Sequence, residues 1–573
     1  MPWPGQPVTS PSGTAAPAAG VPSEPGRSEA TRLLCAGVYF DGKFRRNIIQ
    51  ELVEHEERTI APSLGFDALP VLAHALRAHR RETQTALALL ALWAAFIALG
   101  VLGIGSRTTL FVPWYLGYGL ICLASWAARG HRSSLFTLGR SVLKEATRGR
   151  WKAVLPILPF VLTVLYGVAV SIAWQQGLRP WAAVAFPALL TLPVWVHRLY
   201  VISVMHHQLS RDAFARGSHP QLPSSARYRR IGAAIAREQY SRLVIYDPFR
   251  PFVGAGDPYK PWSVVMELKE TARAAPWQRR DADSPPRAEP ARPGTPEGGS
   301  RSAPLTGREV VELIKPQLAV LRTSAAATSR DRLRSLEVDE LVYLPPGPQR
   351  DQLDRDPEAI QAHLDQAVGE GAEARRHFLR VRVGAWDEQV VICMLVRVHT
   401  QGRMLVLEVA PHVLMPVRPE YKSVDVIAAQ SPYGLRDAVQ ALFSSPSAGF
   451  AAGVWLVQTC LSASRTWLTN PQYAPPDAPV ASVRELGSAQ EVSLFQEMDI
   501  SRYVKTLQDR IAGGVQEALR NKGYETGDFD HYIINVGEGG VFIGDMSGGA
   551  VATGEWGSAK HLGIAAEKGS STT

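Results

Sequence analysis

Four runs of apolar residues between positions 83 and 205 constrain the fold of this chain more than any other feature. The first three runs contain no charged residue at all. A helix of about 20 such residues crosses the ~30 Å hydrocarbon core of a bilayer. We therefore predict an α-helical membrane domain of about four transmembrane helices. Their expected ranges are about 83–105, 109–128, 153–174 and 180–200.

The fourth run differs from the others because it contains two prolines and ends in charged residues. Pro187 and Pro193 are acceptable where neighbouring helices satisfy the freed carbonyl groups. His197 and Arg198 stand at its end, where polar side chains usually extend toward the membrane surface. Transport paths usually carry ionisable residues within the membrane, and the first three runs have none. The sequence favours a membrane anchor over a transporter.

Basic residues are distributed unevenly around these runs. The two short loops that follow the first and third runs carry only Arg107 and Arg179. Basic clusters occupy the other side, at 77–81, 129–152 and 211–230. Because basic residues stay on the cytoplasmic side, we predict a multi-pass protein of the cell membrane with both termini in the cytoplasm.

The net charge of +8 belongs to the same pattern. The basic residues flank the apolar runs, and no nucleic-acid recognition motif accompanies them. The predicted partner is therefore the lipid bilayer and no nucleic acid. Cys35, Cys122, Cys393 and Cys460 lie far apart, which excludes a disulfide scaffold and a thiolate zinc knuckle.

The segment before the first apolar run divides into two parts. Residues 1–33 are rich in proline and are expected to be disordered. Residues 34–82 are expected to form a cytoplasmic strand–helix segment. Within it, 38–43 predicts a short strand and a turn, and the apolar residues of 48–53 predict an amphipathic helix.

Residues 206–275 are more polar than the apolar runs and are expected to form a cytoplasmic, β-containing segment. The apolar stretches 243–246 and 262–268 predict two strands, and the Gly/Pro-rich loop between them predicts a hairpin. Gly254 and Gly256 form a GxG that we interpret as a tight turn, because no helix and no GK[ST] follow it. Residues 276–304 are expected to be a disordered linker.

Residues 305–530 predict a cytoplasmic α+β domain. Three β-rich stretches, 377–383, 389–399 and 403–409, predict an antiparallel sheet. The stripe of apolar residues in 495–523 predicts a helix that docks on the domain, which the lack of sustained heptads favours over a coiled coil. Residues 447–463 are uncharged but short for a membrane span, so we expect a buried or membrane-resting helix there.

Few residues are candidates for metal binding or catalysis. Adjacent residues on a helix diverge by about 100°, so His206 and His207 do not readily share one metal ion. Glu337, Asp339 and Glu340 form an acidic cluster that we interpret as a solvated lead-in to a strand. No catalytic, cofactor-binding or metal-binding residue, and no cofactor, is predicted.

Three stretches and a glycine-rich end together carry a family resemblance. The stretches are Tyr246 with the Pro-Phe-Val-Gly-Ala-Gly of 251–256, Trp262-Ser263, and the Met-Asp-Ile-Ser-Arg-Tyr of 498–503. This combination resembles uncharacterised multi-pass membrane proteins of high-GC actinobacteria such as streptomycetes. The resemblance covers most of the chain outside the N-terminal tail and the linker, and it implies no activity, cofactor or site residue.

The C-terminal segment 531–573 is rich in glycine, with short apolar triplets at 541–543 and 550–552. It resembles glycine-rich terminal segments proposed as amyloid-type signalling motifs in bacterial defence proteins. Low charge favours strand stacking and hence self-association, whereas glycine opposes ordered strands and favours a flexible tail.

These observations lead to one expected function and two alternatives. We expect a membrane-anchored sensor, scaffold or signalling protein with a cytoplasmic binding domain, which binds a protein partner or self-associates through its tail. The alternatives are a membrane-bound enzyme whose site is assembled from scattered residues and, third, a transporter. Local motifs do not decide between these three functions. An active site can be assembled from residues that are far apart in sequence, and such a site leaves no local motif.

Overall fold

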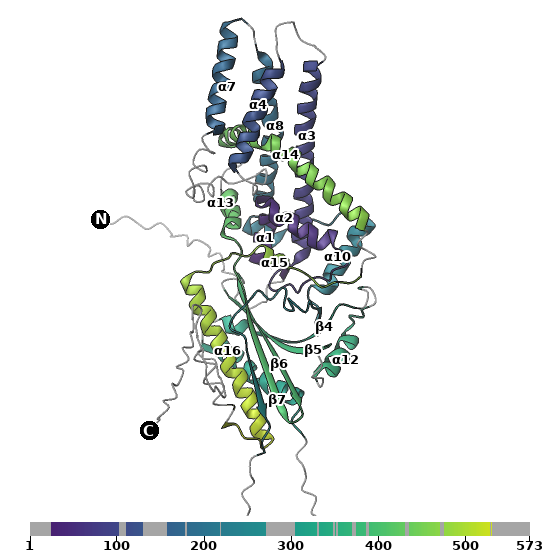
Figure 1. Ribbon diagram of the computed structural model, residues 1–573. Helices are drawn as coiled ribbons and strands as arrows, with labels where there is room; N and C mark the ends of the chain where they lie inside the picture. Colours follow the sequence, from purple (N-terminus) through teal and green to yellow (C-terminus); the bar gives the residue numbers. More distant parts are fainter. Residues whose placement is uncertain are drawn as a thin grey trace, which may run out of the picture.

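The computed structural model of the 573-residue chain shows a helical bundle, a compact junction and a β-sheet domain along one long axis (Figure 1). The residues that it describes are 25–101, 111–129, 158–177, 180–217, 219–270, 304–328, 332–347, 350, 353–368, 374–385, 389–429, 435–469, 475–527 and 529. Residues 1–24, most of the expected linker and the glycine-rich tail lie outside this description.

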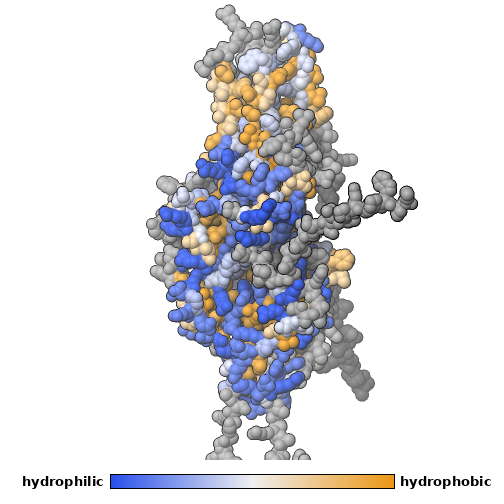
Figure 2. Space-filling view, turned by 180° about the vertical axis from the view of Figure 1, so that it is seen from behind, coloured by the Kyte–Doolittle hydropathy of each residue, from blue (hydrophilic) through white to orange (hydrophobic). Residues whose placement is uncertain are grey.

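Four apolar helices form the bundle at one end of the molecule. They are α3 (Ala68–Val101), α4 (Phe111–Arg129), α7 (Leu158–Gln175) and α8 (Trp181–His207). In the described part of the chain, α7, α8 and the 68–99 part of α3 are long and apolar enough to cross a membrane. Their outward-facing side chains are mostly hydrophobic, as Figure 2 shows. The prediction of a helical membrane part is therefore supported.

Two of these helices continue beyond the bundle into a second core. At 1.5 Å per residue, the 34 residues of α3 extend about 50 Å, much more than a bilayer core requires. The N-terminal part of α3 and the C-terminal part of α8 pack with buried apolar residues of shorter elements. These elements are α1 (Glu29–Phe40), α2 (Gly42–Ile49), η2 (Gln50–Glu54), α9 (Arg211–Arg216), α10 (Ala226–Glu238), η4 (Pro419–Lys422), α13 (Ser423–Ala429) and α15 (Val483–Leu486). We call this cluster the junction core.

The sheet lies beyond the junction core. Its order is β1–β4–β5–β6–β7–β2, and β3 also pairs with β7. The strands are β1 (Leu243–Ile245), β2 (Asp257–Pro258), β3 (Trp262–Glu267), β4 (Glu337–Leu344), β5 (Arg376–Ala385), β6 (Val390–Gln401) and β7 (Met404–Leu414). The three predicted β-rich stretches form the antiparallel β5–β6–β7 ladder, so the expected α+β architecture agrees with the structure.

Two strands are paired differently from the sequence-based expectation. We expected 243–246 and 262–268 to form one hairpin. Instead, β1 pairs in parallel with β4, whereas β3 pairs with β7 near the opposite edge of the sheet. The hairpin prediction is wrong because β5 and β6, which come later in the chain, separate β4 from β7 in the sheet.

One face of the sheet is covered by two long helices. Helices α11 (Gly307–Thr328) and α16 (Leu494–Asn521) bury apolar side chains against β5, β6 and β7. The predicted helix over 495–523 is present as α16 and docks on the domain as expected, and the structure shows that the docking surface is the sheet. Helix α12 (Pro357–Val368) covers β1 and β4 with Leu364 and Ala367. Pro316 lies inside α11 without ending it.

The N-terminal segment differs from its prediction. Residues 29–33, expected to be disordered, belong to helix α1, and residues 38–40 also belong to α1 instead of a strand. Asp41 then caps α2, because its carboxylate accepts hydrogen bonds from the backbone N–H groups of Lys43 and Phe44. The aromatic and β-branched residues that suggested a strand are buried in the junction core, and this packing outweighs local propensity.

Helix α14 (Leu435–Thr469) includes the uncharged stretch 447–463. It crosses the base of the bundle and then runs obliquely toward α10 (Figure 1). It packs against α3, α4 and α8.

Candidate functional site at the junction of helices and sheet

A buried ion pair joins the first helices of the junction to the bundle. Arg45 on α2 meets Glu82 on α3, and their side chains are 5% and 4% exposed. Arg45 Nη1 also donates a hydrogen bond of 2.7 Å to the carbonyl oxygen of Val38. Burial, aided by neighbouring Arg46, lowers the pKa of Arg45 to about 10. The two charges depend on each other, since either charge alone in this setting is strongly unfavourable.

A second set of polar contacts lies one turn further into the bundle, on α8. Thr85 Oγ1 and His197 Nδ1 are 3.3 Å apart, and Arg198 Nη2 donates to Gln440 Oε1 on α14 at 2.5 Å. We expected His197 and Arg198 to extend outward to the membrane surface. This expectation is wrong: they are only 9% and 8% exposed, because α3 and α14 cover this end of α8.

Together these side chains form what we call the polar layer: Arg45, Glu82, Thr85, His197 and Arg198. It links α2, α3, α8 and α14 at the boundary between the apolar bundle and the junction core. Buried polar groups require their partners, so the layer favours one arrangement of these four helices. Sequence analysis missed Arg45 and Glu82. The available signal was Glu82 itself, an acid at the border of an apolar run.

The GxG loop holds an anion from the same chain. The backbone N–H groups of Gly254 and Gly256 donate to Glu485 Oε1 at 2.7 and 3.2 Å. Both glycines have φ near +97°, and a Cβ on Gly256 would lie 2.3 Å from the carbonyl oxygen of Val413. The interpretation as a tight turn agrees with this geometry, and the two N–H groups of the loop bind the carboxylate of Glu485.

The neighbouring Arg484 fastens α15 to the sheet. Its side chain is fully buried, and Nη2 donates to the carbonyl oxygens of Gln389 and Met415 at 2.6 and 3.2 Å. Residues 484 and 485 therefore anchor α15 to the sheet and to the GxG loop at once.

The acidic cluster is part of a strand and not a lead-in to it. Glu337 and Asp339 lie on one face of β4, where they pair with Arg382 and Arg380 on β5 at 2.6 and 2.7 Å. Glu340 points to the other face, since side chains alternate along a strand. The interpretation as a solvated lead-in is wrong, and the three carboxylates do not converge on one site.

Glu340 instead forms a small charged triad between β4, β5 and α11. Its two oxygens lie 2.8 Å from His377 Nε2 and 2.5 Å from Lys315 Nζ. The hydrogen bond from His377, with that from Lys315, lowers the pKa of Glu340 to about 2 despite its partial burial. The triad ties α11 to the sheet.

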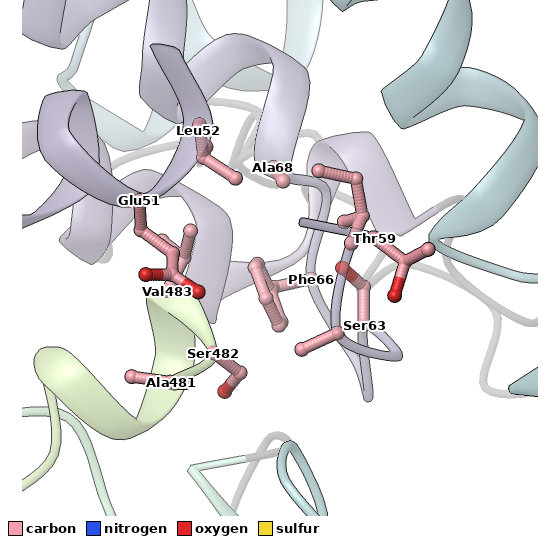
Figure 3. A pocket seen from close by; sticks show the side chains of 11 residues that line it. Glu51, Leu52, Thr59, Ser63, Phe66, Ala68, Ala481, Ser482 and Val483 are labelled. Carbon is pink, nitrogen blue, oxygen red and sulfur yellow. The ribbon is translucent and has the colours of Figure 1, made fainter. Parts of the chain in front are cut away.

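A small cavity lies between the 51–68 segment and α15. Its lining includes Thr59, Ser63, Phe66 and Ser482 (Figure 3). Its volume of about 10 Å³ suits a single water molecule and is far below that of an organic ligand. This cavity is therefore a packing feature of the junction.

The two adjacent histidines of α8 do not belong to a metal-binding cluster of the described residues. The rings of His206 and His207 are centred 6.5 Å apart at the end of α8. Within the described ranges, no group of three or more His, Cys, Asp or Glu residues could hold a metal ion.

Comparison with known families gives one match. A sequence model of the AbeC-like domain matches residues 261–548, just over half of the 573 residues. The chain belongs to the AbeC-like domain family. The expected membership of an uncharacterised family is supported to this extent. No curated protein and no solved structure matches the chain.

The match to the AbeC-like domain covers only part of the sheet. The match begins at the start of β3 and includes α14, whereas β1, β2 and the helices α3, α4, α7 and α8 precede it. The domain thus relies on preceding strands to complete its sheet. It also supplies α14, the helix that packs directly against the apolar bundle.

Proposed function

We propose that the protein is a membrane-anchored signalling or scaffold protein whose AbeC-like domain binds a cytoplasmic partner and is coupled to the membrane helices. The observation that carries this proposal is the continuity of α3 and α8. Each helix runs without interruption from the apolar bundle into the junction core. A continuous helix of this kind connects a displacement at one end to the other.

Two contacts extend this coupling to the AbeC-like domain. The ring of Tyr421 on η4 lies against Gly37 on α1 so closely that a Cβ on Gly37 would be 2.4 Å from it. Next to it, Arg418 Nη1 pairs with Asp41 Oδ2 at 2.7 Å. The N-terminal helices therefore serve as the connecting piece between the bundle and the domain.

The proposed topology has about four spans in the cell membrane, with both termini in the cytoplasm, as in multi-pass proteins of actinobacteria. It is tested with reporter fusions in the loops on the two sides. A fusion after Arg107 is expected to report the outside and one after Arg140 the inside. The reverse result would contradict the orientation.

The coupling is tested by hydrogen exchange of the full chain in lipid nanodiscs. Gly37→Val displaces Tyr421, and we expect exchange in η4 and α13 to accelerate at least tenfold. Gly167→Val is the matched control, because no atom lies within 4 Å of a Cβ at this position. Equal exchange in both variants would contradict coupling through α1.

The binding role is tested by crosslinking in native membranes, followed by purification of the full chain. We expect the wild-type protein to retain a defined partner protein and Gly37→Val to lose it. Retention of a small molecule that is converted to a product would instead support the membrane-bound enzyme.

A further inference from the structure

Helix α14 has an inner face that enters the apolar bundle. Ala441 and Ala448 are buried in the same cluster as Leu190 on α8 and Tyr118 on α4. Ser445 accepts a hydrogen bond from Thr191, at an Oγ–Oγ distance of 3.4 Å. Thr191 lies among the apolar residues of α8 and not at its charged end, so the part of α14 around Ser445, in its first third, is level with membrane-spanning residues.

The other face of α14 is apolar and exposed. Leu442, Val457 and Leu461 are 51%, 60% and 63% exposed, and we call them the outer row. Residues 438–464 contain no Asp, Glu, Lys or Arg. A helix face that is this apolar and this exposed among the described residues is typical of a surface that binds lipid or another protein.

The surroundings of the outer row indicate that lipid covers it. The helices that α14 packs against also expose apolar side chains, among them Leu120 on α4 and Leu189 on α8. At its other border, exposed Arg46 on α2 donates to Gln458 Oε1 at 2.6 Å. An apolar face bordered by a cation, at the end of a transmembrane bundle, is the arrangement of helices that lie in the membrane interface.

We propose that α14 is an interfacial helix whose outer row rests among the lipid acyl chains of the leaflet nearest the sheet. Beyond the part around Ser445, the helix runs obliquely away from the bundle toward α10 (Figure 1), so its depth decreases from there to its C-terminal end. Of three exposed positions on it, Leu442 lies deepest, Cys460 is shallower, and Leu468 lies at or beyond the headgroups. This inference rests on the proposed membrane anchoring.

The test uses the full chain, one copy per nanodisc, with a bimane label on single cysteines and brominated phosphatidylcholine as the quencher. Cys460 is exposed on α14, whereas Cys35, Cys122 and Cys393 are buried, and the Cys460→Ser protein without an added cysteine measures any labelling of these three. The other labelled positions, in a Cys460→Ser background, are Phe160→Cys, Leu442→Cys, Leu468→Cys and Val265→Cys.

We expect brominated lipid to quench the labels at positions 442 and 460 at least twofold, with 442 quenched more than 460 and 460 more than 468. Position 265, which is half exposed on β3, is the control and is expected to remain unquenched. Quenching at position 160 on α7 together with none at 442 and 460 would overturn the proposal for α14 alone. Absence of quenching at 160 would overturn membrane anchoring itself.

A second copy of the chain is the alternative occupant of the outer row. In detergent, it would give a Cys460–Cys460 crosslink and a dimer mass. That result, combined with unquenched labels in single-copy nanodiscs, would contradict the lipid assignment. A monomer with quenched labels supports it.

Discussion

The backbone of α11 leaves no room for a side chain on α16 where the two helices cross: a Cβ on Gly514 would lie 2.7 Å from the Cα of Ile314. The neighbouring Gly513 faces open space, with no atom within 4 Å. These adjacent glycines therefore fulfil different roles on one helix. Only Gly514 permits the close approach that buries Ile314 and Leu507 on the sheet.

The first prediction follows from this difference. Gly513→Ala is expected to stabilise the protein by up to about 1 kcal/mol, because alanine favours a helix over glycine. Gly514→Ala is expected to destabilise it by about 1–3 kcal/mol, since the helices must move apart. Thermal unfolding of the purified protein measures both. Effects of the same sign would contradict the close packing of α11 and α16.

The second prediction concerns the buried pair Arg45–Glu82. Glu82→Gln leaves the guanidinium of Arg45 without its counter-charge and is expected to cost about 3–5 kcal/mol. The double variant Arg45→Met/Glu82→Leu removes both charges and is expected to recover most of this loss. Resistance of the junction to proteolysis in nanodiscs is a suitable measurement.

The control for this pair is an exposed one. Arg308 and Asp365 form an ion pair with side chains 37% and 57% exposed. Asp365→Asn is expected to change stability by less than about 1 kcal/mol. A loss for Glu82→Gln no larger than that for Asp365→Asn would show that the polar layer does not hold the helices.

The third prediction is a pH dependence. The pKa of Glu340 is lowered to about 2 by His377 and Lys315, compared with 4.5 for an ordinary glutamate. The resulting stabilisation is fully present above about pH 5 and is lost as the pH falls toward 2. It amounts to at most about 3 kcal/mol.

Acid unfolding of the wild type and of Glu340→Gln measures this contribution of Glu340 to the free energy of unfolding. The wild type is expected to lose stability more steeply between pH 5 and pH 2, because glutamine does not titrate. Glu337→Gln, which removes a half-exposed carboxylate on the same strand, is the control. Parallel acid profiles for wild type and Glu340→Gln would refute the role of the triad.

The fourth prediction compares the effect of alanine at two glycines with positive φ. Gly256 has φ +97° and no space for a Cβ, whereas Gly402 has φ +56° and nothing within 4 Å. Gly402→Ala is expected to cost about 1 kcal/mol for the backbone conformation alone. Gly256→Ala is expected to cost several times more and to release Glu485 from the loop. Thermal unfolding and hydrogen exchange of the 254–256 amides test this prediction. Equal losses of stability in the two variants would contradict the tight packing of the GxG loop.

Some elements could be predicted because their signal is local. The apolar runs of α3, α7 and α8 exclude most alternatives to membrane helices by length alone. In α16, a regular apolar stripe predicted both the helix and the face that docks. The ladder of β5, β6 and β7 followed from three adjacent stretches with short turns, where nearest neighbours in sequence pair most easily.

Other features depend on residues that are far apart in sequence. The strand expected at 38–43 is helical because α1 is buried on nearly all sides by the junction core. The partners of β1 and β3 are strands about 100 and 140 residues away, as their pairing with β4 and β7 shows. The polar layer joins four helices whose residues carry no common motif.

The sequence by itself determined which segments are apolar enough for a membrane, where the main helices and strands form, and that the sheet is antiparallel in its centre. Only the tertiary structure decided how α3 and α8 enter the junction core, where α14 crosses the bundle, and which charges are buried together. The physical reason is that periodicity and hydropathy act over a few neighbouring residues. Pairing and burial depend instead on which distant surfaces fit together once the chain closes on itself.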